Sequence, residues 1–177
     1  MLRLETPRLI LIASTQEQVR DTVLNPQRFA QEVGAQLTSE WPPKNFHPFA
    51  PDIFAQMTSF PSQVGWWVWW ILKRPEAGVP QSPVVIGYVG FKGAPTQVGS
   101  VEATYELTPS LMGRGYAGEA LGALVQWAFT QPKVKRIVAD TTPENMASKR
   151  TLEKCGFRFL ELESDEDELV YLKLKAG

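Results

Sequence analysis

"VEATYELTPSLMGRGYAGEAL", residues 101–121, joins a strand pattern to a glycine-rich turn and the start of an apolar helix. Gly113, Gly115 and Gly118 have the Gly-x-Gly-x-x-Gly spacing of a dinucleotide fingerprint. Glycine lets the backbone approach a phosphate closely, and a helix N-terminus supplies free N–H donors and a positive dipole. The stretch therefore predicts a phosphate-binding turn between a strand and a helix, but it does not by itself identify the ligand.

The flanking segments place this turn in a mixed sheet. Residues 84–93, "VVIGYVGFKG", form a predicted strand, and the short turn after them indicates a hairpin with residues 101–108. An apolar helical face is predicted over residues 117–131, followed by a strand over 134–140 and a helix over 142–156 capped by Thr142. Two closing strands are expected around the acidic turn Glu163–Glu168. Only one strand–helix–strand unit is parallel in this arrangement.

The N-terminal half predicts a strand in "LRLETPRLILIAS" and a helical segment over residues 15–33, broken near Asn25-Pro26. Residues 41–52 are too rich in proline for regular structure, and a short helix is expected through Phe54 and Met57. The tryptophan-rich run 65–73 reads as a central strand covered on both faces, or as a strand with one face lining an acceptor pocket. We predict one α/β (α+β) domain over residues 1–177, with a mixed, mostly antiparallel sheet flanked by helices.

Composition narrows the possible partners. The formal net charge of −1 argues against nucleic acid, and no apolar run reaches the length of a membrane span. No signal peptide is recognised, so a cytoplasmic protein is expected. The single cysteine, Cys155, and the single histidine, His47, make a metal site unexpected.

A dinucleotide-dependent oxidoreductase is one interpretation of the glycine turn. Asp140 ends the next predicted strand 22 residues after Gly118, near the place where an acidic residue would bind a ribose hydroxyl. A doubly wound dinucleotide domain, however, needs several further strand–helix units, and the residues after Asp140 supply one helix and a hairpin. The topology makes this interpretation the weaker one.

Three segments, "LETPRLILI", "VEATYELTPSLMGRGYAGEAL" and "NMASKRTLEKCGF", occur in an order and spacing that resemble the GNAT superfamily of acyl-CoA-dependent N-acyltransferases. The most similar branch includes the ribosomal-protein-alanine N-acetyltransferases and the spermidine acetyltransferases. The resemblance implies a GNAT-like fold and direct transfer of the acetyl group of acetyl-CoA, the co-substrate, to a primary amine in a ternary complex. It covers the N-terminal strand and most of residues 101–157.

The resemblance also implies which residues hold coenzyme A. The family's turn pattern falls on Met112, Gly115 and Ala117, so backbone N–H groups in the turn would bind the pyrophosphate, and Met112 replaces the usual polar residue. In the family the strand before the turn is bulged and separates from its neighbour, and its N–H groups near Tyr105 to Leu107 would meet the oxyanion. The implied cofactor-binding residues are Leu107, Met112, Gly113, Arg114, Gly115, Tyr116, Ala117 and Asn145.

Amide formation requires a neutral amine, so a general base is expected. Glu102 matches a glutamate that this branch carries, although it could instead be a solvated strand carboxylate. Glu106, on the same face by period-two spacing, is the reserve candidate. For the leaving thiolate, the tyrosine of many GNAT enzymes is replaced by Leu152. Ser148, one turn after Asn145, is the alternative proton donor, directly or through water.

Several questions stay open at this level. Because Met112 and Leu152 depart from the family pattern, a non-catalytic acyl-CoA-binding or regulatory domain is the alternative to an enzyme. The acceptor could be a protein or peptide N-terminus, a polyamine, an antibiotic or another small amine. A homodimer is possible. If the acidic turn 163–168 borders the acceptor channel, a cationic acceptor would be favoured.

Overall fold

The computed structural model describes residues 1–76, 78, 81–163 and 168–176. Within these residues the strands form one sheet in the order β1-β2-β4-β5-β6-β7-β9-β8, with β3 pairing in parallel with β5. The strands are β1 (Arg3–Glu5), β2 (Leu9–Ala13), β3 (Gln36–Leu37), β4 (Val68–Lys73), β5 (Val84–Phe91), β6 (Ser100–Leu107), β7 (Arg136–Thr141), β8 (Arg158–Glu163) and β9 (Glu168–Leu174). The helices are α1 (Gln16–Leu24), α2 (Pro26–Val33), α3 (Phe46–Ser59), α4 (Tyr116–Thr130) and α5 (Met146–Lys154), with a 3₁₀ turn at Pro109–Leu111.

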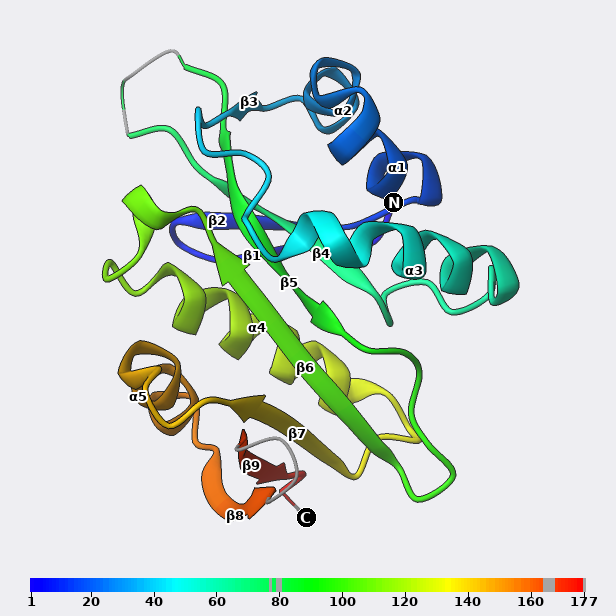
Figure 1. Cartoon of the computed structure of the whole chain (residues 1–177), viewed down its shortest axis with the longest axis vertical. Helices are drawn as coiled ribbons and strands as arrows, with labels where there is room; N and C mark the ends of the chain where they lie inside the picture. Colours follow the sequence, from blue (N-terminus) through cyan, green and yellow to red (C-terminus); the bar gives the residue numbers. More distant parts are fainter. Residues whose placement is uncertain (77, 79–80, 164–167, 177) are drawn as a thin grey trace.

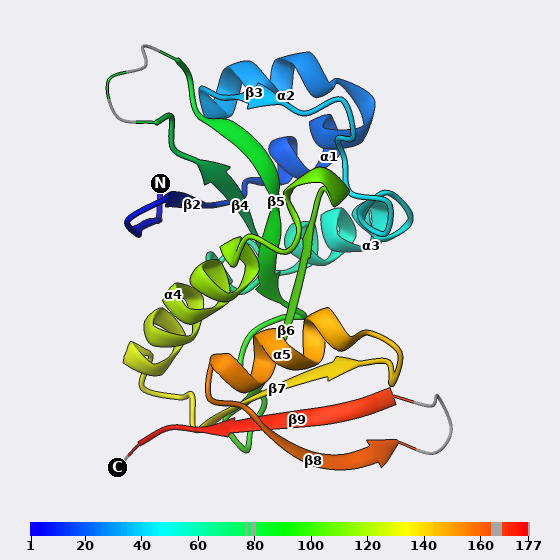
Figure 2. The ribbon, with the colours of Figure 1, turned by 90° about the vertical axis from the view of Figure 1, so that its left-hand side faces the viewer.

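The two faces of the sheet carry different helices (Figures 1 and 2). Helices α4 and α5 cover one face, and α1, α2 and α3 cover the β1–β5 part of the other. Successive side chains of a strand point to opposite faces, so Trp69 packs in the α4 core and Trp70 in the α1–α3 core, both fully buried. This confirms that the tryptophan-rich run is a central strand covered on both faces. The mixed, mostly antiparallel sheet flanked by helices is confirmed as well.

In the N-terminal part of the chain, local sequence signals predicted the helix break correctly and the first strand incorrectly. Asn25 ends α1, and its side chain accepts a hydrogen bond from the Arg28 N–H at the start of α2, so the break at Asn25-Pro26 is confirmed. The predicted first strand is instead a hairpin, because Thr6 and Arg8 separate β1 from β2.

Two helix boundaries were wrong. Helix α3 begins at Phe46, inside the segment predicted to be irregular, and it contains Pro51. Burial of its apolar face against β4 and β5 outweighs the hydrogen bond that the proline removes. Helix α5 begins at Met146 with Asn145 as its N-cap, not at Thr142, because the Asn145 side chain accepts from the Ser148 N–H at 3.0 Å.

Candidate active site

Strands β6 and β7 run in parallel only at their start and then separate. They pair from Ser100↔Arg136 to Glu102↔Val138, after which β6 stays with β5 and β7 stays with β9. In Figure 1 they leave the lower right together and diverge, β6 toward the upper left and β7 toward α5. We call the space between the separated stretches the β6–β7 opening; its closed end is the Glu102↔Val138 pair.

Backbone groups of β6 face this opening. Glu102 and Thr108 form backbone hydrogen bonds with β5, since the Lys92 N–H donates to the Glu102 carbonyl and the Thr108 N–H donates to the Ile86 carbonyl. Because backbone groups alternate between the two neighbours of a strand, the N–H groups of Tyr105 and Leu107 point into the opening. The expected bulge in this strand is absent: the β5–β6 register is continuous, and the sheet's irregularities lie in the β4–β5 and β8–β9 pairs.

The glycine turn at the wide end leads into α4. Gly113 and Gly115 adopt left-handed φ values of 74° and 80°, which favour glycine, and a Cβ at Gly113 would meet no atom within 4 Å. Within the described chain, none of the backbone N–H groups of residues 113–118 donates a hydrogen bond. The N-cap of α4 is Gly115, which has no side chain to accept from these groups. A row of free N–H donors therefore surrounds an open space at the positive end of a helix. Gly118 lies in the first turn of α4, so the third glycine of the dinucleotide spacing contributes a free N–H but no left-handed turn residue.

Arg8 braces the glycine turn, a role that sequence reasoning missed. Its Nε donates to Glu119 at 2.6 Å, its Nη1 donates to the Arg114 carbonyl at 3.0 Å, and its guanidinium lies 4.6 Å from the centre of the Tyr116 ring. Burial raises the pKa of Glu119, but hydrogen bonds from Thr6 and Arg8 outweigh it and lower that pKa overall. Glu119 therefore stays ionised and holds Arg8 beside the turn.

A pair of hydroxyl groups lies on the α5 side of the opening. The Tyr105 Oη is 2.8 Å from the Ser148 Oγ, and either atom can be the donor. Burial raises the pKa of Tyr105 to about 12, although its bond with Ser148 lowers it, so Tyr105 keeps its proton at neutral pH. Leu152 is fully buried and contributes only to the core. The Oδ1 of Asn145 is used as the α5 cap, which leaves its amide NH₂ as the group for a ligand.

Glu102 belongs to a charged cluster on the opposite face of the sheet. The Lys92 Nζ contacts Glu102 directly and lies 3.5 Å from Asp140. Burial raises the pKa of Glu102, the Lys92 ammonium opposes this, and Asp140 adds to it, so the pKa lies above its ordinary value. The pKa of Asp140 is lowered, because hydrogen bonding to Glu102 and the charge of Lys92 outweigh its burial. Lys92, Glu102 and Asp140 thus form one electrostatically coupled cluster.

The position of Asp140 also weakens the oxidoreductase interpretation. Ile137 and Ala139 of β7 point into the α4 core, so Asp140, next in alternation, lies on the opposite face from α4 and the glycine turn. The crossover β6–α4–β7 is moreover one parallel unit in a sheet whose other long pairings are antiparallel. An acidic residue on the far face has no access to a ribose bound beside the turn.

Glu106 lies on the same face as Glu102 but is held by a different segment. Its Oε1 accepts hydrogen bonds from the Asn45 N–H at 3.3 Å and from the Asn45 side-chain amide at 3.1 Å. Burial raises its pKa and the hydrogen bonds from Asn45 oppose this, while its Oε2 is buried without a hydrogen-bond partner among the described residues. Glu106 therefore anchors the start of α3 to β6.

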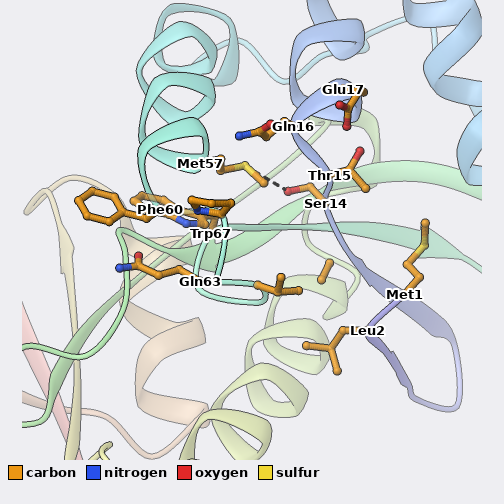
Figure 3. Close-up of a pocket in the computed structure, with 13 residues that line it drawn as sticks. Met1, Leu2, Ser14, Thr15, Gln16, Glu17, Met57, Phe60, Gln63 and Trp67 are labelled. Atoms are coloured by element: carbon orange, nitrogen blue, oxygen red, sulfur yellow. Dashed lines mark hydrogen bonds between the residues drawn. The ribbon is translucent and has the colours of Figure 1, made fainter.

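A cavity of about 460 Å³ lies between the N-terminus of α1 and the end of α3 (Figure 3). Met57, Phe60 and Trp67 supply much of its apolar wall, and the Ser14 and Met57 side chains point toward each other across its rim. It contains no predicted site residue. The Trp67 ring also packs beside Gly93, since a Cβ added to this glycine would lie 3.5 Å from the ring. Gly93 follows Lys92 in the chain. The cavity and the charged cluster therefore lie at the same end of the sheet.

The described residues contain neither a metal site nor a membrane-spanning helix. No group of three or more histidine, cysteine, aspartate or glutamate side chains there is placed to hold a metal ion. No helix in the same residues has the length and apolar character needed to cross a bilayer. The acidic turn named in the sequence falls largely on residues 164–167, outside the described residues.

A parallel β–α–β unit with separated strands and a turn of free N–H groups at its wide end is the architecture that the family resemblance implied. The chain belongs to the GNAT acetyltransferase family, whose domain model matches residues 8–158. It is 28% identical over 156 residues to the uncharacterised N-acetyltransferase YjdG of Bacillus subtilis, covering 88% of this chain and 85% of that protein.

Solved structures share the fold. An acetyltransferase from Agrobacterium tumefaciens is 25% identical with a TM-score of 0.61, covering 98% of this chain and 94% of that one. The ribosomal-protein-S5-alanine acetyltransferase of Vibrio fischeri is 15% identical with a TM-score of 0.66, covering 100% and 98%. Microcin C7 self-immunity acetyltransferase MccE, solved with acetyl-CoA and AMP, is 15% identical with a TM-score of 0.63, covering 96% and 93%. These likenesses confirm the fold, and the family model over residues 8–158 confirms the family resemblance read from the three sequence segments.

Proposed function

We propose that this protein transfers the acetyl group of acetyl-CoA to a primary amine by direct attack within a ternary complex. One observation carries the proposal: the β6–β7 opening joins the glycine turn at its wide end to Glu102 at its closed end. The solved structure of MccE with acetyl-CoA, a protein of the same fold, supports the choice of co-substrate. Acetyl-CoA supplies the thioester carbonyl that the amine attacks.

The residues present fit coenzyme A. The free N–H groups of residues 113–118 match the oxygens of a pyrophosphate, and Arg114 and Arg8 add positive charge beside them. Met112 is half exposed and contributes no polar group, but backbone donors do not depend on the side chain. Tyr105 and Leu107 offer N–H groups to the pantetheine amides and to the charge that develops on the carbonyl oxygen, and the Asn145 amide NH₂ reaches the pantetheine arm from α5.

The proton-transfer groups lie on opposite faces of the opening. Glu102 accepts a proton from the acceptor ammonium on the α1–α3 face, directly or through water. Ser148, oriented by Tyr105, lies on the α5 face and donates a proton to the leaving thiolate. This separation allows the amine to enter from one face while the thiol leaves toward the other, which is what direct transfer requires.

The Ser148→Ala variant should lower kcat only modestly, by roughly tenfold or less, because a thiol with a pKa near 8.5 is a fair leaving group unaided. Tyr105→Phe, which keeps the ring and removes the hydroxyl, should give an effect of the same size. The double variant should be no slower than the worse single one, since the two hydroxyls act as one unit. Steady-state release of coenzyme A measures all three; an unchanged rate in Ser148→Ala would assign the donor role to water.

The glycine turn gives a prediction with a matched control. Gly113→Ala should weaken acetyl-CoA binding by about tenfold or more, because a Cβ enters the open space of the turn and strains a left-handed residue. Gly122→Ala places a Cβ in open space too, but inside α4 with ordinary helical geometry, so binding should not change. Calorimetric titration with coenzyme A compares the two, and equal affinities would remove the turn from the binding site.

Binding is tested by thermal shift with acetyl-CoA, coenzyme A and NADH in parallel. At about 100 times its dissociation constant, a ligand of the native state adds about 2.7 kcal/mol, or roughly 5–11 °C in Tm for a chain of this size. We expect a rise with both coenzyme A species and none with NADH. A rise with NADH alone would contradict the proposal. Binding of acetyl-CoA without turnover of any amine would favour the non-catalytic alternative.

The acceptor is proposed to approach from the α1–α3 face. The cavity lined by Trp67 lies at the same end of the sheet as Glu102, so an amine with an apolar or aromatic portion fits this face. An acceptor screen should therefore pair each arylalkyl amine with an alkyl amine of similar length. Peptides with a free N-terminus belong in the same screen, because a ribosomal-protein acetyltransferase shares the fold.

A further inference from the structure

Lys92 brings a primary amine of the protein itself to the closed end of the β6–β7 opening. It follows β5 and faces Glu102 across a backbone-paired position, since the Lys92 N–H donates to the Glu102 carbonyl. The Lys92 Nζ contacts the Glu102 carboxylate and lies 3.5 Å from Asp140, which belongs to the separated stretch of β7. The side chain thus reaches from the β5 side across β6 to Asp140 of β7, at the closed end of the opening.

This placement is the one that an acceptor amine needs. On the proposed function, the reactive amine must lie beside Glu102 on the face away from α4, and the Lys92 Nζ is already there. About half of the Lys92 side chain is exposed (52%), so it can change rotamer and is open to a second reactant. Burial lowers the pKa of Lys92, but the Glu102 and Asp140 carboxylates outweigh it and raise that pKa, so the ammonium must give up its proton before it can attack. Being held on two carboxylates limits the entropy that it loses in reaching the attacking position.

We propose that Lys92 is a self-acetylation site, modified by this enzyme's own reaction with acetyl-CoA. The inference rests on the proposed function, because it uses the same opening and the same base. The Lys92 ammonium gives one proton to Glu102, and its nitrogen forms a bond to the thioester carbonyl carbon. The carbon–sulfur bond breaks, and the thiolate leaves with the bonding electrons and takes up a proton. The products are Nε-acetyl-Lys92 and free coenzyme A.

Acetylation would remove the one cation that contacts both Glu102 and Asp140 in the described structure. Glu102 and Asp140, with Glu168 of β9 hydrogen-bonded to Asp140, would then share the site without that counter-charge, so one of these carboxyl groups would hold a proton more strongly. The modified enzyme would consequently need a higher pH to keep Glu102 ionised. Self-acetylation would therefore change the pH dependence of transfer to free acceptors.

The test is incubation of the purified full chain with acetyl-CoA in the absence of an acceptor, followed by intact mass and peptide mapping over time. We expect the mass of one acetyl group to appear on Lys92 at least roughly tenfold faster than on any other lysine, because Lys92 alone is held at the base. The remaining lysines report the uncatalysed background in the same sample. Glu102→Gln should reduce the Lys92 rate to that background, and Lys92→Arg should abolish the fast phase.

Release of coenzyme A with an amine panel, measured on the same preparation, separates the two proposals. If free amines are acetylated but Lys92 reacts no faster than the other lysines, the self-acetylation proposal is overturned and the proposed function stands. If neither Lys92 nor any amine is acetylated although acetyl-CoA binds, the proposed function fails and the self-acetylation proposal fails with it. A rate per molecule that rises with protein concentration would indicate transfer between copies and would also overturn it.

Discussion

Glu102→Gln is expected to lower kcat by about 10²–10⁴-fold while leaving the affinity for acetyl-CoA unchanged. Glutamine keeps the size and hydrogen-bonding shape of the side chain but cannot accept the proton of the acceptor ammonium. In the wild type, activity should fall as pH drops through the pKa of Glu102, which burial and Asp140 hold above its ordinary value of about 4.3. The variant should lose this acid limb, and rate measurements between mildly acidic and mildly alkaline pH will show it.

Glu106→Gln is the matched control for that experiment. It makes the same chemical change on the same strand and the same face, but the Glu106 Oε1 is engaged by Asn45, and a glutamine oxygen can still accept both bonds. We expect an effect much smaller than that of Glu102→Gln and no change in the acid limb. If Glu106→Gln lowers kcat more than Glu102→Gln does, then Glu106 is the base and the assignment to Glu102 is wrong.

Trp70→Ala is expected to destabilise the fold by about 3–5 kcal/mol, the range for deleting a buried aromatic side chain. The Trp70 ring is fully buried, lies 4.9 Å from Phe29 and 5.4 Å from Phe46 between ring centroids, and donates its Nε1 proton to Gln18 at 3.1 Å. It therefore joins α1, α2 and α3 to β4. For a chain of this size the Tm should fall by roughly 6–20 °C.

Phe49→Ala provides the contrast for stability. Phe49 lies on α3 as well, but 57% of it is exposed, so its removal should change the free energy of unfolding by no more than about 0.5 kcal/mol. Denaturant unfolding at fixed pH measures both variants. A Trp70→Ala protein as stable as Phe49→Ala would mean that the aromatic cluster does not hold the three helices on the sheet.

The C-terminal half of the fold could be predicted because its local signals agree with one another. The strand pattern over 101–108, the glycine turn and the apolar helix face fix the order β6–α4–β7, and short turns predict the antiparallel neighbours. The prolines in residues 41–52 led to a wrong prediction of irregular structure, because burial of one face of α3 decides the structure there and residue preference does not. The prediction that Thr142 caps the helix was wrong, because Asn145, three residues later, is the N-cap of α5.

The candidate residues of the site came from the sequence, whereas their contacts came only from the structure. Resemblance to a known family supplied Glu102, Ser148, Asn145 and the glycine turn, and the structure places them around one opening. It did not supply the Tyr105–Ser148 pair or the Arg8 brace, because these contacts join residues that are far apart in the sequence. Lys92 is likewise unremarkable in the chain and becomes informative only when β5, β6 and β7 lie side by side.

The most direct test of the central claim is transfer of a labelled acetyl group from acetyl-CoA to the amine panel, with coenzyme A release and acetylated product measured together. We predict that at least one amine gives one product molecule per coenzyme A released, and that Glu102→Gln suppresses both signals alike. Tight binding of acetyl-CoA with no acetylated product from any peptide, polyamine or arylalkyl amine would contradict the claim and leave a binding domain in its place.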